Sequence, residues 1–199
     1  MFIQLIQGKC NRPNDLRRLL DRWQAELAPS APGWLGATYG FTEDGTSVAV
    51  VRFESREKAM ENSAKPEQDQ WFNEVQKCYI GPMEFVNCGD VTTLMEGGSD
   101  SAGFVQVMRG RVTDTKKLKS LVSGAHAEEL HQARPEIIGA TLGIDDDGRF
   151  VQTIAFTDEE SARRGERLDM PEEVRADLEG SMADVTYIDL HEPFFSSPG

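Results

Sequence analysis

The sequence lacks the features of membrane, secreted and disulfide-bonded proteins. No apolar run reaches the roughly 18–20 residues that a membrane-spanning helix needs. Residues 1–7 have no basic start, no long apolar region and no small-residue cleavage site, so we expect no signal peptide. The three cysteines, Cys10, Cys78 and Cys88, show no C-x-x-C spacing. A disulfide framework or a zinc site is therefore not expected, and the sequence predicts a cytoplasmic protein with reduced thiols.

Positive charge is also scarce. The 199 residues include 21 Lys and Arg against 34 Asp and Glu, for a net charge of −13. Both halves are acidic, with 10 basic and 15 acidic residues in 1–100 and 11 and 19 in 101–199. Nucleic-acid binding requires clustered cations to neutralise phosphates, so we expect no nucleic-acid partner. The acidity is best explained as a source of solubility.

An internal repeat organises the sequence. Residues 2–9, FIQLIQGK, match residues 104–111, FVQVMRGR, at an offset of 102. Gly36-Ala37-Thr38 recurs as Gly139-Ala140-Thr141 after one residue of slippage. Matches in register across a whole half indicate a duplication.

The repeat predicts two domains. Copy one is expected at residues 1–95 and copy two at 103–199, with a linker at 96–102 that contains Gly97-Gly98. The first copy is expected to have strands at 2–9, 33–41, 46–53 and 83–92, because these runs are apolar or alternate.

Helices are expected between these strands. Leu16, Leu19, Leu20, Trp23 and Leu27 follow helical spacing after Pro13, and a second helical region is interrupted by Pro66. In copy two, Thr157-Asp158-Glu159-Glu160 resembles a capping box and Pro171 is the interruption. The order is β-α-β-β-α-β twice, so the predicted fold class is α+β with two tandem ferredoxin-like units.

The strands carry apolar residues on both faces. In residues 2–9, Ile3 and Leu5 alternate with Phe2 and Ile6. Helices on one face of a four-stranded sheet leave the other face bare. We therefore expect the two copies to pack sheet to sheet as an intramolecular dimeric α+β barrel, either as a monomer with an internal pseudo-dimer or as a homodimer.

The repeated motifs carry a family resemblance. The doubled first strand, the doubled Gly-Ala-Thr and the junction Arg52-Phe53-Glu54-Ser55 resemble the dimeric α+β barrel superfamily, over nearly the whole chain. The resemblance is to antibiotic-biosynthesis-monooxygenase-like proteins, in particular a tandem form from actinobacteria. Members of the superfamily include cofactor-free oxygenases that form quinones, haem-degrading enzymes, isomerases and proteins without known activity, so fold alone does not choose a function.

The histidines argue against haem. The haem-degrading branch ligates iron through a histidine on the second helical region. The three histidines here are His126 and His131, expected on the first helix of copy two, and His191 after its last strand. We therefore expect no haem, no metal site and no other cofactor, and we interpret His126 and His131 as surface residues.

An aromatic pocket in copy one is the alternative that the resemblance suggests. Cofactor-free oxygenases bind a phenolic substrate in an apolar pocket with a few polar groups. The candidate pocket residues are Gln4, Arg52, Asn62, Trp71, Phe72 and Tyr79. The competing interpretation is that Trp71, Phe72, Val75, Cys78 and Tyr79 form a helix-to-sheet core stripe.

One pair of equivalent residues is shared by the two copies, and a second pair differs between them. Gln4 and Gln106 are either structural, bonding across the interface of the copies, or face a ligand cavity, and their occurrence in both copies favours structure. Arg52 is replaced by Ala155 in copy two. Arg52 is expected either to bind an anionic ligand or to form an ion pair, the second being the simpler hypothesis.

The sequence thus supports two hypotheses about the function. The first is a cofactor-independent monooxygenase that acts on a small aromatic or hydrophobic molecule in copy one. The alternative is a non-catalytic small-molecule-binding or structural barrel protein. The tail, with Phe194 and Phe195, is expected to cover a sheet edge or to reach another subunit.

Overall fold

The computed structural model describes residues 1–95, 97–123 and 125–198. The chain forms two compact units. Unit 1 consists of Met1–Gly89 together with the segment from Phe194 to the C-terminus, and unit 2 consists of Asp90–Pro193. The units therefore divide the chain differently from the repeat, because the last residues of copy two belong to unit 1. No helix in the described part of the chain is long and apolar enough to cross a membrane.

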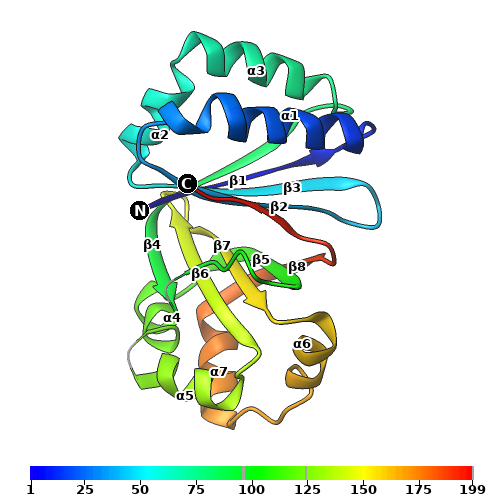
Figure 1. The fold of residues 1–199 in the computed structure, drawn as a ribbon. Coiled ribbons are helices and arrows are strands. Elements are labelled where there is room, and N and C mark those ends of the chain that lie inside the picture. Colours follow the sequence, from blue (N-terminus) through cyan, green and yellow to red (C-terminus); the bar gives the residue numbers. More distant parts are fainter. Residues whose placement is uncertain (96, 124, 199) are drawn as a thin grey trace. The chain divides into compact units, whose positions relative to one another are not determined.

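Unit 1 is a layer of helices on one face of an antiparallel sheet (Figure 1). Its strands follow the order β4-β1-β3-β2-β9. Its elements in chain order are β1 (Phe2–Lys9), α1 (Pro13–Glu26), η1 (Ala28–Ser30), β2 (Trp34–Phe41), β3 (Thr46–Phe53), α2 (Arg56–Ser63), α3 (Pro66–Gln76), the first part of β4 (Glu84–Leu94) and β9 (Phe194–Ser196).

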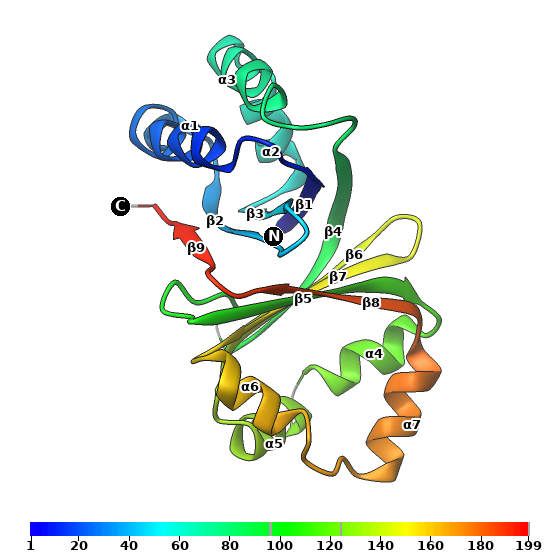
Figure 2. The ribbon, with the colours of Figure 1, turned by 90° about the vertical axis from the view of Figure 1, so that its right-hand side faces the viewer.

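Unit 2 repeats this plan (Figure 2). Its strands follow the order β8-β5-β7-β6-β4. Its elements are β5 (Phe104–Val112), α4 (Thr115–Leu121), α5 (Ala125–Ala133), β6 (Ile137–Asp145), β7 (Arg149–Phe156), α6 (Glu159–Gly165), α7 (Glu172–Ser181) and β8 (Met182–Leu190). The predicted α+β class with two tandem β-α-β-β-α-β units is confirmed.

The first helix of unit 1 forms where its sequence signals lie. Pro13 occupies the first turn, where a missing N–H costs nothing, and Leu16 and Trp23 are buried on one face. Phe2, Trp23, Trp34 and Phe53 form one core cluster between this helix and the sheet. Burial of these large side chains stabilises unit 1 by about 1.5–3 kcal/mol for each one.

The helical regions differ from expectation in two places. The first helical region of copy two is divided into α4 and α5, so His131 lies on the second of two helices and is exposed. Likewise, α6 is capped by Asp158 rather than Thr157, since Asp158 Oδ1 accepts the Ser161 N–H at 2.7 Å. An ionised carboxylate is a stronger acceptor than a hydroxyl at the positive end of a helix.

Each unit gains an edge strand from beyond its own copy. In unit 1, Phe194–Ser196 pairs with β2, with Phe195 opposite Thr38. In unit 2, β4 neighbours β6, and the part of β4 from Asp90 to Leu94 belongs to this unit. The prediction that the tail covers a sheet edge is confirmed, and the covered edge is that of β2.

The glycine of the Gly-Ala-Thr motif, Gly36 in copy one and Gly139 in copy two, lets a neighbouring segment approach the strand closely. A Cβ at Gly36 would lie 2.9 Å from the Ser196 carbonyl oxygen, and a Cβ at Gly139 would lie 1.9 Å from the carbonyl oxygen of Gly97. The strand pairing shifts by one residue at both glycines. Only a residue without a side chain allows another segment to approach so closely there.

Candidate functional site

The sheet of unit 1 separates the predicted pocket residues into two groups. Phe2 and Trp71 pack in the same cluster on the helical face, whereas Arg52 pairs in register with Ile3, the next residue along β1. Adjacent residues of a strand point to opposite faces. Arg52 therefore lies on the face without helices, away from Trp71, Phe72 and Tyr79.

Arg52 is almost completely buried. Its side chain is 9% exposed and Nη1 donates to Thr38 Oγ1 at 3.1 Å. Gly36 lies beside the guanidinium, since a Cβ there would be 2.9 Å from Nη2. The hydroxyl of Tyr39, on the same sheet, has a raised pKa because burial disfavours its charged form. The Arg52 guanidinium is thus enclosed beside Gly36 and Thr38 of β2.

On the helical face, aromatic side chains fill the interior. Trp23 contacts Trp34 with ring centroids 5.0 Å apart and Trp71 with centroids 6.1 Å apart. Trp71 Nε1 donates to the Leu19 carbonyl at 2.8 Å. The structure thus brings Trp71 and Phe72 together on α3, with their rings 6.5 Å apart, as parts of the packed core. This arrangement agrees with the core-stripe interpretation of α3.

Tyr79 and Asn62 lie at separate points of the same layer. The Tyr79 hydroxyl donates to Ser47 Oγ at 3.1 Å, and burial raises the Tyr79 pKa to about 12. Tyr79 is therefore a neutral donor at physiological pH and not a base. Asn62 is buried on α2. Phe72 packs on α3 and also contacts Phe85 of β4, with ring centroids 6.2 Å apart.

The paired glutamines bond within their own sheets. Gln4 Nε2 donates to Asn87 Oδ1 at 2.8 Å, and Gln106 Nε2 donates to Asp189 Oδ1 at 3.0 Å. In both copies the acceptor is the residue directly opposite on the neighbouring last strand. These bonds join β1 to β4 and β5 to β8, so each glutamine bonds within its own copy rather than across to the other.

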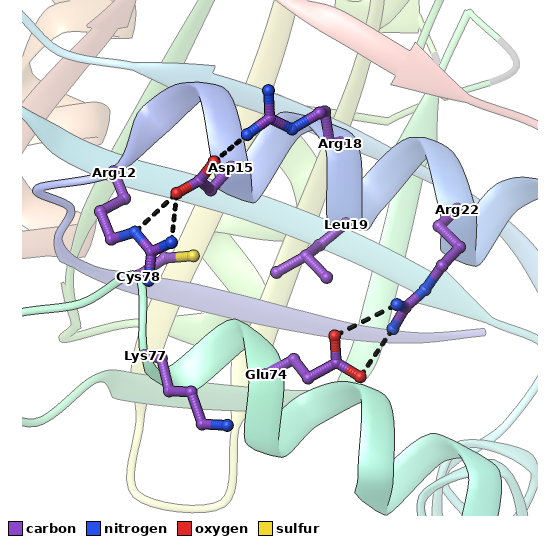
Figure 3. Close-up of a pocket in the computed structure, with 8 residues that line it drawn as sticks. All are labelled: Arg12, Asp15, Arg18, Leu19, Arg22, Glu74, Lys77 and Cys78. Carbon is purple, nitrogen blue, oxygen red and sulfur yellow. Dashed lines mark hydrogen bonds and ion pairs between the residues drawn. The ribbon is translucent and has the colours of Figure 1, made fainter.

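An open groove lies between α1 and α3 (Figure 3). It has a volume of about 380 Å³. Four cationic and two anionic side chains line it, together with Leu19 and Cys78. The charged lining residues are Arg12, Arg18, Arg22, Lys77, Asp15 and Glu74. The groove therefore carries an excess of two positive charges in a chain whose net charge is −13.

Two ion-pair clusters stand at the two ends of the groove (Figure 3). At one end, Asp15 accepts from Arg12 Nε at 2.6 Å and also pairs with Arg18. At the other end, Arg22 forms a two-bond pair with Glu74 at 3.0 and 3.1 Å, which ties α1 to α3. The hydrogen bonds to Arg12 and Arg22 lower the pKa of Asp15 and Glu74, respectively, so both carboxylates are ionised at neutral pH.

The sequence prediction missed this groove. Its cations lie 65 residues apart in the chain at their extremes, Arg12 on one side and Lys77 on the other. One signal was available: Asp15, Arg18, Leu19 and Arg22 recur at helical spacing and share one face of α1. That face is charged on a helix whose other face carries Leu16 and Trp23 into the core.

Unit 2 has a polar cluster in the corresponding layer. Arg163 pairs with Asp189 at 2.5 Å, with Glu166 at 3.0 Å and with Glu159 at 3.3 Å. The hydrogen bond to Asp189 raises the Arg163 pKa above its ordinary value. His191 Nδ1 lies 2.7 Å from Glu159 Oε2 and completes the cluster.

The two other histidines, His126 and His131, belong to α5. The side chain of His126 lies outside the described residues. Within the described part of the chain, no group of three His, Cys, Asp or Glu residues is placed to hold a metal ion.

Comparisons with known proteins identify the fold. No protein-family model and no curated protein matches the sequence. Among solved structures, a "putative monooxygenase" of Fusobacterium nucleatum matches with a TM-score of 0.78 and 11% identity, over 100% of this chain and 94% of that one. One of Lactobacillus acidophilus matches with a TM-score of 0.74 and 12% identity, over 98% and 96%. The chain has their fold.

A third full-length match extends the comparison. A protein described as anthrone oxidase-like has a TM-score of 0.64 and 10% identity, over 100% of this chain and 93% of that chain. The tandem architecture is therefore shared along nearly the whole length of these proteins. Such low identity establishes the fold alone, and the activity follows only from the residues.

Proposed function

We propose that the protein is a cofactor-independent monooxygenase that acts on a small aromatic substrate bound in the helical layer of unit 1. The observation that carries this proposal is the groove of about 380 Å³ between α1 and α3, which is lined by an excess of positive charge. Its size is within the range of small-molecule sites. The fold shared with proteins described as monooxygenases and anthrone oxidase-like supports the same reading.

The cations supply the electrostatics that such a reaction needs. A phenol gives an electron to dioxygen readily only after it has lost its proton. Guanidinium and ammonium groups near a phenolic oxygen favour its charged form and lower its pKa. In this proposal Arg18, Arg22 and Lys77, which line the groove, hold the phenolate.

The reaction balances without a cofactor. One oxygen atom of dioxygen is inserted at a ring carbon and the other leaves as water, so the substrate supplies four electrons in all and the two hydrogen atoms of the water. The products are a quinone and one molecule of water. The substrate is oxidised and dioxygen is reduced, so no other reductant is required.

The proton of the phenol passes to solvent in this proposal. Asp15 and Glu74 are weak bases because their ion pairs lower the pKa of each. Tyr79 is a neutral donor, with its pKa raised to about 12. The chain therefore contributes binding and charge stabilisation rather than a strong general base.

One observation favours the non-catalytic alternative. Trp23, Trp34 and Trp71 pack against one another in the space between α1, α3 and the sheet. A substrate therefore has access to the groove but not to an interior pocket at these residues. A binding protein without catalysis requires only such a groove.

Oxygen uptake with a panel of mono- and bicyclic phenols separates the two functions. A monooxygenase consumes one dioxygen for each quinone formed, and Arg22→Ala lowers the rate at least about tenfold, because one charge-assisted contact is worth roughly 1.5–3 kcal/mol. Arg164→Ala, an exposed residue of unit 2, is the control and leaves the rate unchanged. Saturable binding of phenols without uptake would establish the binding function instead.

A second arm tests Arg52 separately. Because Arg52 lies on the opposite face of the sheet from Trp71, the variant Arg52→Lys keeps the groove intact. We expect it to retain the uptake rate, while Trp71→Ala lowers the rate by loosening α1 and α3. A large loss of uptake in Arg52→Lys with normal folding would place the reaction on the other face.

A further inference from the structure

We infer that the groove between α1 and α3 binds a small aromatic carboxylate, whose carboxylate is held by the arginines and Lys77 and whose ring lies over Leu19. This inference names the substrate class of the site proposed above and rests on that site. It concerns binding, so it is tested without turnover.

The placement of the lining residues defines the shape of the site. Asp15, Arg18, Leu19 and Arg22 lie on one face of α1, and Arg12 lies at its N-cap position. Glu74, Lys77 and Cys78 line the groove from α3 and the residues that follow it (Figure 3). The groove is thus bounded by two separate elements, with charge at both ends and Leu19 between them.

The positive charge of the groove is only partly neutralised by the protein: four cations meet three carboxylates, because Glu26 also lies 3.9 Å from Arg22. Asp15 is shared between Arg12 and Arg18, so one carboxylate faces two guanidinium groups. Glu74 already accepts two hydrogen bonds from Arg22, although it lies beside Lys77. An anionic ligand supplies the charge that is missing at Arg18 and Lys77.

The guanidinium groups favour a planar anion. A guanidinium has five donors in a fixed fork that matches the two oxygens of a carboxylate. Arg18 and Arg22 use only part of this set on their protein partners. Arg18 donates one hydrogen bond to Asp15, and Arg22 donates two to Glu74 while its Nε lies 3.9 Å from Glu26. A ligand carboxylate therefore adds bonds and need not displace the existing pairs.

The middle of the groove suits an apolar ring. Leu19 contributes a branched aliphatic surface, and Cys78 contributes a thiol whose pKa is raised by burial. A protonated thiol is a small apolar group. The cavity of about 380 Å³ holds one or two fused rings beside the charged ends.

Equilibrium binding of 1-naphthoate to the full-length chain tests the inference, with calorimetry as the readout. The uncharged 1-naphthamide, of nearly the same shape, is the ligand control, and inorganic phosphate tests for binding by charge alone. We expect saturable binding of naphthoate, at least about tenfold weaker binding of naphthamide, and weakening of naphthoate binding by salt. Equal affinity for naphthoate and naphthamide overturns the inference, and so does the absence of saturable naphthoate binding at about 1 mM.

Variants assign the binding to the groove. Lys77→Ala and Arg18→Ala are each expected to weaken naphthoate binding about tenfold, whereas Arg164→Ala leaves it unchanged. Both groove variants remove exposed side chains, Arg18 on α1 and Lys77 at the C-cap of α3, and circular dichroism checks their fold. Naphthoate binding that survives in both variants places the site elsewhere and overturns the inference. Phosphate binding as tight as that of naphthoate would mean that the ring contributes nothing to binding, and it would overturn the inference of an aromatic ligand.

The two proposals fail in different ways. If naphthoate binds as expected but no phenol of the panel is oxidised, the result supports the groove as a site for aromatic anions and contradicts the monooxygenase proposal. If uncharged phenols are oxidised at rates that Lys77→Ala and Arg18→Ala do not change, the result supports the monooxygenase proposal and contradicts the carboxylate site.

Discussion

Gln106 donates a hydrogen bond to Asp189 across β5 and β8, and Gln4 makes the equivalent bond to Asn87 across β1 and β4. The geometry is the same in both copies, but the acceptor is neutral in copy one and charged in copy two. The negative charge of Asp189 is matched by Arg163, which lies 2.5 Å away. In copy two the charged acceptor is thus paired with a cation.

The first prediction concerns Arg163. Arg163→Ala leaves Asp189, Glu159 and Glu166 close together without their shared cation, so we expect a loss of about 1–3 kcal/mol in the free energy of unfolding. Denaturant titration measures it. The neighbour Arg164, which is 60% exposed against 31% for Arg163, is the matched control, and Arg164→Ala is expected to cost no more than about 0.5 kcal/mol. Equal effects of the two substitutions would contradict the role assigned to the cluster.

The second prediction concerns acid stability. The hydrogen bonds from Lys9, Thr42 and Thr46 hold the pKa of Asp44 well below its ordinary value. A group whose pKa is lower in the folded state stabilises the fold above its unfolded pKa, and this stability is lost as the pH falls through the folded pKa. Stability is therefore expected to decline below about pH 4.

The variant Asp44→Asn isolates this contribution. It is expected to be less stable than the parent at pH 7 and to approach the parent as the pH falls, in unfolding titrations at a series of pH values. Asp169→Asn, at an exposed position without an ion pair in the described part of the chain, is the control. A constant difference between Asp44→Asn and the parent from pH 7 to acid would disprove the linkage.

The third prediction concerns alkaline pH. Burial raises the pKa of Tyr79 to about 12, against about 10 for an unfolded tyrosine. The folded state keeps this proton to a higher pH than the unfolded state does. Its stability therefore decreases as the pH rises from about 10 through about 12. Ultraviolet absorbance of the phenolate follows the titration. Tyr79→Phe removes that late step, and a native titration in which Tyr79 ionises near pH 10 would refute its burial.

The fourth prediction concerns the tail. Phe194 stacks on Tyr39 with centroids 5.2 Å apart, and the guanidinium of Arg17 lies 4.1 Å from its ring centre. Phe194→Ala is expected to cost about 1–3 kcal/mol and to expose the edge of β2, with increased aggregation. Thermal unfolding and light scattering measure the two effects. The exposed Glu192→Ala should show neither, and an unchanged Phe194→Ala would mean that β9 does not hold the edge.

The fifth prediction concerns Gly139. A Cβ there would meet the Gly97 carbonyl oxygen at 1.9 Å, so Gly139→Ala must displace backbone and is expected to cost about 1–3 kcal/mol. At Gly180 of α7 a Cβ meets nothing within 4 Å, and Gly180→Ala is expected to be neutral or slightly stabilising. Chemical denaturation ranks the pair, and the reverse order would contradict the close approach at β6.

Most of the fold could be predicted from the internal repeat and from local patterns. The period of two in residues 2–9 and the helical spacing from Leu16 to Trp23 are local patterns, so both elements were found with nearly correct ends. The division of α4 from α5 was missed because no proline or glycine pair marks it as clearly as Pro66 marks α2 from α3. The packing of the two sheets against each other stays a prediction.

The site was harder to predict because it depends on tertiary contacts. Residue type suggested Arg52 and Trp71 as parts of one pocket, but strand parity places Arg52 on the opposite face of the sheet. Lys77 became relevant only once α3 packed beside α1, since nothing in its local sequence links it to Arg22. Trp71 and Phe72, predicted to line a pocket, pack against the core, and their role as pocket residues stays a prediction. The charged residues of the groove were not singled out from the sequence.

The return of the chain end to unit 1 has a practical consequence. A protease that cuts between residues 97 and 103 leaves Phe194–Ser196 hydrogen-bonded to β2, so the two fragments are expected to co-elute as one particle under native conditions and to separate only in denaturant. Expression of either half by itself yields a sheet with one edge missing. The duplication can therefore diverge in sequence, one half from the other, without the halves becoming independent molecules.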